Sequence, residues 1–327
     1  MPLTLRNTPV HFRHKKSDPD DAYAWSVSPD SIVQKGARRV EGRSSFSFDF
    51  IFDETATTAQ VYDAMIQPIV RGVAMGQNGT VFCYGQTGSG KTYTMQGDDG
   101  SHNDGGIVQI VAGDLFKGIE EKSAERDYVV RVSYIEIYNE TVRDLLDKIE
   151  MNADDEVSSF GSRSKGNRAI ERSPSQTVDF RTLVVREDPK RGGVYVNCKE
   201  REVNNTVALI DVLQAGNQNR SCASTNMNER SSRSHAIFRI ILESRQKTKN
   251  FPDGAVRIAN LNLVDLAGSE NGHQTSTYQH RREGGKINQR YELFVRTKEF
   301  STPKQCFLIL CSSCYVVYFP FLKSFML

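Results

Sequence analysis

The chain has 327 residues, 38% of them hydrophobic and 25% charged, which is enough to bury one large core or two smaller ones. Its formal net charge of +2 argues against a general nucleic-acid-binding protein, because such proteins usually have a strong basic excess. Six irregularly spaced cysteines indicate reduced thiols of a cytosolic protein; Cys311 and Cys314 lack the second pair or the histidines of a metal site. Residues 1–16 contain no apolar stretch, so no signal peptide is predicted.

The first part of the chain alternates strand and helix patterns. Residues 46–52 alternate Phe with Ser or Asp, which predicts a strand. Residues 59–74 have apolar residues at helical spacing around Pro68, which predicts a kinked or stepped helix. The apolar run 80–84 is typical of a buried strand, and the residues from Thr92 onward can open a helix. Residues 129–137 alternate again and predict another strand.

The second part resumes this order after an interruption. Residues 150–178 are dominated by Ser, Asn, Arg and Glu, so they bury too little surface to offset chain entropy, and we expect a disordered surface insert. Residues 207–213 predict a helix capped by Asn205 or Thr206. Residues 235–243 and 256–265 predict two strands joined by a turn-rich connector. Strands alternating with helices predict an α/β sheet with helices on both faces.

The residues between the strand at 80–84 and the helix after it fit the pattern G-x-x-x-x-G-K-[ST] of a phosphate-binding P-loop. They are Gly85, Gln86, Thr87, Gly88, Ser89, Gly90, Lys91 and Thr92. Glycines let the backbone N–H groups of such a loop face phosphates. Lys91 is expected to reach the β- and γ-phosphates and the Thr92 hydroxyl to ligate Mg²⁺. The alternative is a Gly/Ser/Thr-rich surface turn, which the strand context and the complete Gly-Lys-Thr ending disfavour.

Two later segments extend this nucleotide hypothesis. Residues 228–235, NERSSRSH, place hydroxyl groups around Arg233, and residues 261–270, LNLVDLAGSE, form an apolar strand that ends at Asp265. An Asp at the end of a strand beside the P-loop strand is the Walker B position, which holds Mg²⁺. Each segment alone has an ordinary alternative, a serine-rich loop or a simple turn. Together with the P-loop, and in this order, they favour a nucleotide site.

The three motifs resemble the P-loop, switch I and switch II of the kinesin motor domain. Similarity also extends over residues 46–52, 134–140 and 144–146, while 185–188 and 241–245 look most like the kinesin-7 group, which includes centromere-associated motors. The resemblance implies a P-loop NTPase fold with a central mixed, mainly parallel β-sheet and helices on both faces. We divide the chain into a divergent N-terminal segment (1–39), a motor domain containing the insert (40–288) and an apolar tail foreign to the family (289–327).

The resemblance also implies roles for individual residues. Gly85 to Thr92 would hold the triphosphate of ATP, and Tyr93 would stack on one face of the adenine. The other face of the adenine is usually covered by an Arg-x-Arg-Pro run, which residues 11–15 lack. The Mg²⁺ site would consist of Thr92, Ser232 and Asp265. For hydrolysis, Ser231 and the Gly268 N–H would contact the γ-phosphate. The ion pair of Arg233 with Glu270 would order the attacking water. The alternative for this pair is an exposed ion pair worth about 0–1 kcal/mol.

The implied partner is the microtubule, and the implied activity is ATP hydrolysis that drives movement along it. The basic patch that faces tubulin could begin with Arg281, Arg282, Lys286 and Arg290. The basic residue usually found early in this loop is absent, because residues 271–273 are NGH. The insert 150–178 is an alternative tubulin-contacting or regulatory loop. We expect a cytoplasmic protein on the microtubule cytoskeleton, including the spindle, with no nucleic-acid partner. No heptad run is present, so dimerisation is not predicted from this chain. The alternative function is a truncated kinesin-like protein that binds nucleotide or microtubules without motility.

The resemblance stops after Asn288. The rest of the helix that follows switch II, the next strand, two further helices and the neck linker have no recognisable counterpart, so we expect the C-terminal part of the fold to be missing. Residues 306–322 are apolar but a little short of the ~20 residues of a membrane-spanning helix, and they contain Ser312, Ser313 and Pro320. Three alternatives remain for this tail: a membrane anchor, which is disfavoured, a pair of core strands, or a foreign segment from altered splicing or a truncated gene, which is preferred.

Overall fold

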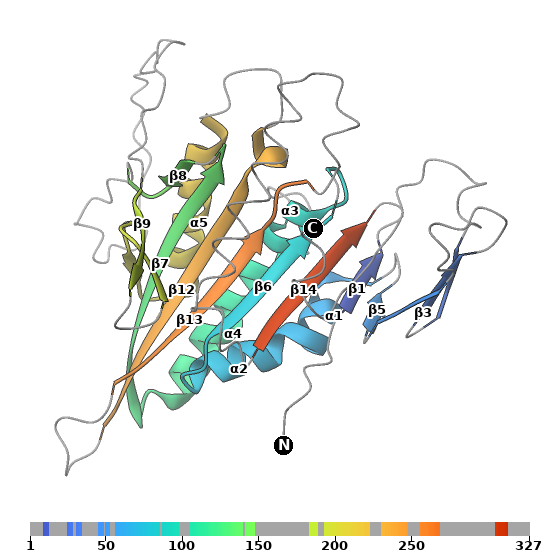
Figure 1. Cartoon of the computed structure of the whole chain (residues 1–327). Coiled ribbons are helices and arrows are strands. Elements are labelled where there is room, and N and C mark those ends of the chain that lie inside the picture. The colour runs from blue at the N-terminus through green and yellow to red at the C-terminus, as the bar shows by residue number, and fades with distance from the viewer. Residues whose placement is uncertain are drawn as a thin grey trace, which may run out of the picture.

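The fold is given by a computed structural model of the whole chain (Figure 1). The residues that it describes are 9–12, 25–28, 31–34, 45–48, 50–52, 56–85, 87–97, 105–139, 141–147, 183–188, 193–222, 230–247, 256–268 and 305–312. The predicted disordered insert at 150–178 lies outside these residues, as does the segment 269–304 that follows switch II.

A nine-stranded sheet forms the centre of the described part of the chain (Figure 1). Its order is β11–β7–β12–β13–β6–β14–β1–β5, and β8 pairs with β7 outside this path. The strands are β1 (Pro9–Phe12), β5 (Phe50–Phe52), β6 (Gly79–Tyr84), β7 (Arg126–Tyr138), β8 (Thr141–Asp144), β11 (Arg201–Val203), β12 (His235–Gln246), β13 (Arg257–Asp265) and β14 (Gln305–Ser312). Neighbours from β13 to β5 pair in parallel, and those from β13 to β11 pair antiparallel. The sheet is therefore mixed, as predicted, but its described strands are not mainly parallel, because the antiparallel half is at least as extensive as the parallel one.

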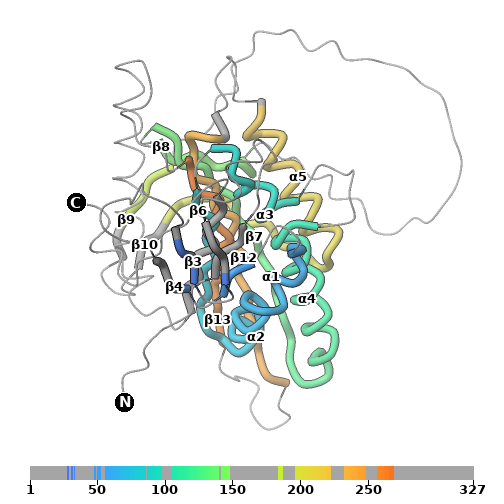
Figure 2. The backbone as a smooth tube through the Cα atoms, turned by 90° about the vertical axis from the view of Figure 1, so that its right-hand side faces the viewer, coloured from blue at the N-terminus to red at the C-terminus, as the bar shows by residue number. Residues whose placement is uncertain are grey.

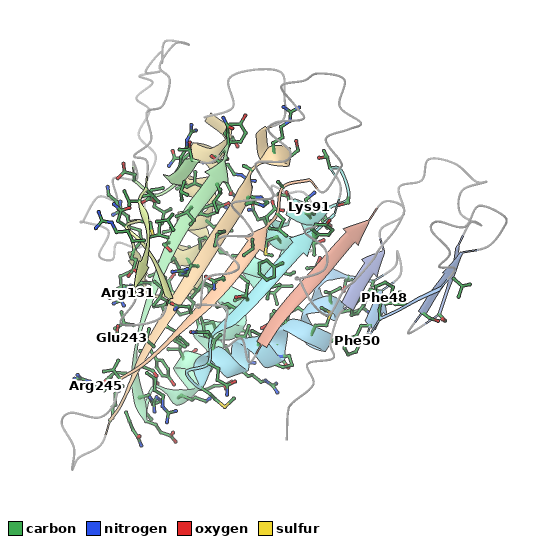
Figure 3. The ribbon with its side chains drawn as sticks, viewed as in Figure 1. Phe48, Phe50, Lys91, Arg131, Glu243 and Arg245 are labelled. Atoms are coloured by element: carbon green, nitrogen blue, oxygen red, sulfur yellow. The ribbon has the colours of Figure 1, made fainter. Side chains whose placement is uncertain are left out.

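The single strand expected at residues 46–52 is broken into two strands that belong to different sheets. A three-stranded sheet contains β2 (Trp25–Val27), β3 (Ser31–Gln34) and β4 (Ser45–Ser47), whereas β5 joins the central sheet beside β1. Phe48 lies at the break and is buried, and the ring of Phe50 stacks on that of Phe52 with centroids 6.3 Å apart (Figure 3). Alternation of Phe with polar residues indicated extended chain correctly, but it contains no information on which sheet each part joins.

The helices of the described residues all lie on one face of the central sheet, as Figure 2 shows. They are α1 (Thr58–Val61), the π-helical turn η2 (Tyr62–Ile66), α2 (Gln67–Ala74), α3 (Lys91–Gln96), α4 (Ile107–Lys122) and α5 (Thr206–Cys222). Helix α4 contacts α1, α2, α3 and α5 and so holds this layer together. Among the described residues, the opposite face has instead the hairpin of β9 (Val185–Asp188) and β10 (Gly193–Val196). Helices on that second face are not tested by the described part of the chain.

The stepped helix predicted around Pro68 is confirmed. Thr57 caps α1, because its hydroxyl accepts the Gln60 N–H at 3.2 Å while the Gln60 side chain accepts the Thr57 N–H at 2.9 Å. The π-helical turn then separates α1 from α2. Pro68 lies in the first turn of α2, where its missing N–H costs no hydrogen bond.

Apolar residues on both faces of the sheet are buried. One core lies between the sheet and the helices and includes Val81, Tyr134, Ile240 and Leu263 from strands and Ile69, Val111 and Leu209 from helices. A second core lies on the opposite face and includes Phe82, Ile135, Ile237, Val264 and Val196. Each such side chain stabilises the fold by about 1.5–3 kcal/mol through burial. Because both faces are covered, the central strands have nearly continuous apolar sequences.

Residues 305–312 of the predicted foreign tail form β14, a strand of the central sheet. This strand pairs in parallel with β6 on one side and with β1 on the other. Its placement supports the core-strand alternative for the tail over the preferred foreign segment, although one strand rather than a pair is found in the described residues. The sequence CFLILC is apolar throughout, as is typical of a strand inside a parallel sheet. No described helix is long and apolar enough to cross a membrane.

Candidate nucleotide site

The predicted P-loop connects β6 to α3, as its sequence indicated. Gly88 and Gly90 have φ angles of 79° and 91°, in the left-handed region that glycine adopts without a steric penalty. Gln86 lies outside the described residues, so the loop is placed by the residues around it. The strand–loop–helix context that a phosphate-binding loop requires is therefore present.

The side chain of Lys91 lies inside this loop (Figure 3). It is 6% exposed, and its Nζ donates a hydrogen bond to the Gly85 carbonyl oxygen at 2.9 Å. Ser89 of the same loop is also buried, and its Oγ has no hydrogen-bond partner among the described residues. A buried ammonium and an unsatisfied hydroxyl on one loop provide donors for an anion.

Thr92 and Asp265 form the second part of the site. Asp265 ends β13 beside Cys83 of β6, and so it lies next to the strand that leads into the P-loop. Thr92 Oγ1 donates to Asp265 Oδ2 at 2.7 Å. Asp265 is 2% exposed, and within the described part of the chain its Oδ1 accepts no hydrogen bond. A buried carboxylate oxygen without a donor, next to a hydroxyl, fits Mg²⁺ and its waters, because this ion prefers oxygen ligands.

The segments expected to be switch I and switch II lie in direct contact. Residues Arg230–Arg233 form a 3₁₀ turn, η3, just before β12. The N–H of Gly268 donates to the carbonyl oxygen of Ser232 at 2.7 Å, and the N–H of Ala267 donates to Nδ1 of His235 at 3.1 Å. The structure thus brings Ser232, Gly268 and Asp265 to the same end of the sheet as the P-loop.

Several predicted site residues are not tested by this geometry. Glu270 and the side chain of Ser231 lie outside the described residues, so the pairing of Arg233 with Glu270 remains a prediction. Tyr93 is half-buried on α3, and the side chains of residues 11–15 lie outside the description. Stacking of Tyr93 on adenine therefore also remains a prediction.

Sequence reasoning missed Arg220, which is buried beside Asp265. The predicted helix ended at Leu213, whereas α5 continues to Cys222 and brings Arg220 under the site. Its Nη1 lies 3.5 Å from Asp265 Oδ2, and its Nε lies 3.8 Å from Glu136 Oε1. Burial opposes its ionisation, but the neighbouring Tyr134, Asp265 and Glu136 outweigh this effect, so the pKa of Arg220 lies above its ordinary value. The surrounding residues 214–222 (QAGNQNRSC) are mostly polar, so no apolar pattern marked Arg220 as a buried residue.

A tyrosine joins the helix after the P-loop to α5. The Tyr134 hydroxyl on β7 donates to Asn217 Oδ1 at 2.7 Å and accepts from Gln96 Nε2 at 3.0 Å. Gly216 permits this approach, because a Cβ at that position would lie only 2.3 Å from the Tyr134 ring. The P-loop helix and the helix leading to switch I are therefore tied to one buried ring.

The fold and the arrangement of these residues define a P-loop NTPase. Residues 6–293 match the family model described as the kinesin motor domain, and the chain therefore belongs to the kinesin motor family. The match extends beyond residues 40–288, the range expected from the motifs, at both ends. This membership confirms the predicted resemblance and implies nucleotide binding.

Curated relatives and a solved structure agree with this family. The chain is 36% identical over 295 residues to Centromere-associated protein E of Homo sapiens, covering 90% of this chain and 10% of that protein. It is 36% identical over 291 residues to Kinesin-like protein KIN-7O of Arabidopsis thaliana, covering 88% and 20%. A structure described as that of a fast kinesin superposes with a TM-score of 0.72 at 29% identity, covering 94% of this chain and 85% of that one. The chain thus spans a fifth or less of these two curated relatives.

Proposed function

We propose that this chain is a Mg²⁺-dependent ATP hydrolase of the kinesin type that binds microtubules. The observation that carries this proposal is the contact of Thr92 with Asp265, 2.7 Å between Oγ1 and Oδ2, beside the buried Lys91. These three residues have the chemistry of a triphosphate and Mg²⁺ site, and they come from two distant motifs that the fold brings together.

Each part of the site has its own task in this proposal. The backbone of the P-loop and Lys91 bind the phosphates, while Thr92, Ser232 and Asp265 hold Mg²⁺, which neutralises charge on the phosphate oxygens during transfer. The Gly268 N–H, which donates to Ser232 O at 2.7 Å, can instead donate to a γ-phosphate oxygen. That exchange would loosen switch II from switch I and make their contact dependent on the nucleotide.

Hydrolysis is proposed to depend on Arg233 and Glu270, which would order the attacking water next to Ser231. Glu270→Ala and Arg233→Ala should each slow single-turnover ATP cleavage without weakening ATP binding, because the pair acts after the nucleotide is bound. The double variant should be little slower than either single variant. Arg131→Ala is the control, since Arg131 pairs with Glu200 and Glu243, and Figure 3 shows Arg131 and Glu243 far from Lys91. Unchanged cleavage in Glu270→Ala would remove this residue from the mechanism.

Microtubule binding and location on the microtubule cytoskeleton, including the spindle, are the cellular part of the proposal. The names of the relatives support it: one is a centromere-associated protein and another a kinesin-like protein. The second candidate is a protein that binds nucleotide or microtubules without motility, favoured by the departure of the sequence from the family model after residue 293. Co-sedimentation with microtubules, together with turnover measured with and without them, separates the two. Binding without stimulated turnover supports the second candidate, and salt-sensitive stimulation supports the first.

A further inference from the structure

We propose that His235 is the positioning residue that fixes the start of switch II, so that Gly268 is the first residue of this segment to change its hydrogen bond when a γ-phosphate is bound. This inference deepens the proposed function and rests on it. It assigns a role to the imidazole at the end of the NERSSRSH run, for which the motifs predicted none.

The first two residues after β13 are held by neighbouring strands. The Leu266 N–H donates to the carbonyl oxygen of Cys83 on β6 at 3.2 Å, and so extends the pairing of β13 with that strand. The Ala267 N–H donates to Nδ1 of His235, the first residue of β12, at 3.1 Å. His235 and Ala267 are 3% and 4% exposed. Because a buried N–H without an acceptor costs free energy, the imidazole replaces the backbone acceptor that is missing where the strand pairing ends.

The next N–H, that of Gly268, has a different kind of partner. It donates to the carbonyl oxygen of Ser232 at 2.7 Å, and Ser232 lies on the turn η3 rather than on a strand. In the proposed function this N–H exchanges Ser232 for a γ-phosphate oxygen. A glycine that follows a fixed residue can turn its backbone at little steric cost. The change from Ala267, held by a strand residue, to Gly268, held by a turn, therefore marks the pivot of switch II.

The support on the other side of this contact is rigid. His235 pairs with Ile137 of β7, and the adjacent Ala236 pairs with Asp265 of β13, so the backbone that carries the imidazole lies inside the sheet. Nδ1 accepts a hydrogen bond, so in the neutral ring the proton is on Nε2. Without this acceptor the peptide group of Gly268 loses its defined starting position. Because ADP has no γ-phosphate, the loss should affect ATP-like nucleotides and leave ADP binding unchanged.

Calorimetric titration in MgCl₂ with ADP and with the non-hydrolysable ATP analogue AMP-PNP tests this. His235→Leu has a side chain of similar size without the acceptor. We expect it to lower the affinity for AMP-PNP roughly tenfold, as for the loss of a hydrogen bond to a charged group, with no change for ADP. His235→Asn places an oxygen where Nδ1 was, and it should retain most of the wild-type preference for AMP-PNP over ADP. An Asn variant that behaves as the Leu variant does would contradict the role of the acceptor.

Ile240→Val is the matched control for lost stability. Ile240 lies on the same strand, is fully buried in the core on the helical face, and pairs with Leu261 in the middle of β13. Its truncation weakens core packing without reaching switch II, so the ratio of the two affinities should stay at the wild-type value. Affinities for ADP and AMP-PNP that fall equally in His235→Leu would indicate a purely structural role and overturn the inference.

A second measurement uses the nucleotide-free protein, with amide hydrogen exchange followed by NMR at single residues. The Ala267 N–H should exchange roughly tenfold faster or more in His235→Leu than in the wild type. The Leu266 N–H should keep its protection, because its acceptor is the carbonyl oxygen of Cys83. Equal acceleration at the two amides would show general destabilisation, and unchanged exchange at Ala267 would show that the contact is absent. Either result overturns the inference.

His235→Gln takes the place of His235→Leu in both measurements if the latter does not fold, because its amide group reaches the position of Nε2 rather than that of Nδ1. A wild-type chain that binds neither nucleotide contradicts the proposed function itself. Binding with the same preference for AMP-PNP in the wild type and in the variant overturns this inference alone.

Discussion

Three charged side chains of the candidate site, those of Lys91, Asp265 and Arg220, are buried at the end of strands β6 and β13. They are 6%, 2% and 7% exposed. Charged residues are seldom buried to this extent unless they are paired, because removal from water costs several kcal/mol per ion. The ion pair of Arg220 with Asp265 and the hydrogen bond of Lys91 to Gly85 offset part of this cost. A buried cluster of this kind is typical of a functional site.

Lys91→Ala should weaken ATP binding roughly tenfold or more. The variant loses a charge-assisted contact to phosphate worth about 1.5–3 kcal/mol, and each 1.4 kcal/mol is about a factor of ten in affinity. Lys117→Ala, on the exposed side of α4, is the control and should bind as the wild type does. Equal ATP affinity of Lys91→Ala and Lys117→Ala in titration calorimetry would show that the loop is not a phosphate site.

Two tyrosines allow a matched test of buried hydroxyl groups. The Tyr62 hydroxyl donates to Asp114 Oδ2 at 2.5 Å, whereas that of Tyr128 is buried with no partner among the described residues. Tyr62→Phe should lower the free energy of unfolding by about 1.5–3 kcal/mol, as expected for a hydrogen bond to a charged group. Tyr128→Phe should be neutral or stabilising, because it removes an unsatisfied polar atom. Urea unfolding of both variants checks this, and equal losses would show that the two environments are wrongly assigned.

Residues of the P-loop and Asp265 could be predicted from sequence because each motif is local and its spacing reflects the chemistry of phosphate and Mg²⁺. Arg220 could not, because its partners Glu136 and Asp265 are far away in the chain and become neighbours only through the order of strands. Helix α5 also has few apolar residues near its end, so the pattern did not show that it reaches Cys222. Contacts across strands are set by topology, which a local pattern does not contain.

At the scale of elements, α4 and α5 contain glycines in opposite situations. Gly113 of α4 is exposed and has open space where a Cβ would be, whereas Gly216 of α5 faces the Tyr134 ring at 2.3 Å. The first glycine adds only backbone freedom to the unfolded chain, and the second permits close packing of α5 on β7. The effect of a helical glycine on stability therefore depends on the element that it faces.

Substitution of these two glycines by alanine should have effects of opposite sign. Gly113→Ala should stabilise the fold by about 0.4–1 kcal/mol, because alanine restricts the unfolded chain and favours helix. Gly216→Ala should destabilise it by about 1–3 kcal/mol, because the added methyl group forces Tyr134 or α5 to shift. Thermal unfolding of the two variants measures both effects, and a stabilising Gly216→Ala would contradict the close packing described for α5.

Patterns in the sequence predicted the existence of most elements but not their assembly. The stepped helix around Pro68 and the strand over residues 129–137 followed from apolar spacing and from proline geometry. The break of the predicted strand 46–52 between two sheets could not be foreseen, since Phe48 follows one strand and precedes another with the same alternation. Strand order depends on long-range pairing, which a local sequence pattern does not specify.

At the scale of the whole molecule, β14 completes the parallel half of the central sheet. It lies between β6, which leads into the P-loop, and β1, and without it neither strand would have its neighbour on that side. An unpaired strand edge exposes backbone donors and acceptors and favours association with other chains. The apolar tail sequence is therefore a structural part of the sheet over residues 305–312.

A proline in β14 tests this role. Leu310 pairs with Tyr84 of β6 and with Val10 of β1, so Leu310→Pro removes a ladder hydrogen bond whichever way its N–H points. We expect a loss of about 1–3 kcal/mol in the free energy of unfolding, from the backbone carbonyl group left without a donor. Lys323→Pro, outside β14, is the control. Urea midpoints that are the same for the two variants would contradict the placement of β14 in the sheet.

We propose that the residues of the P-loop, Asp265 and the switch segments form one Mg²⁺-dependent site for ATP hydrolysis. Phosphate release by the purified chain in a single turnover of ATP, measured in MgCl₂ and in EDTA, tests it most directly. We expect release in MgCl₂ that is abolished by EDTA and by Asp265→Ala, because both remove the metal from the phosphates. Release at the same rate in EDTA, or in Asp265→Ala, would contradict it.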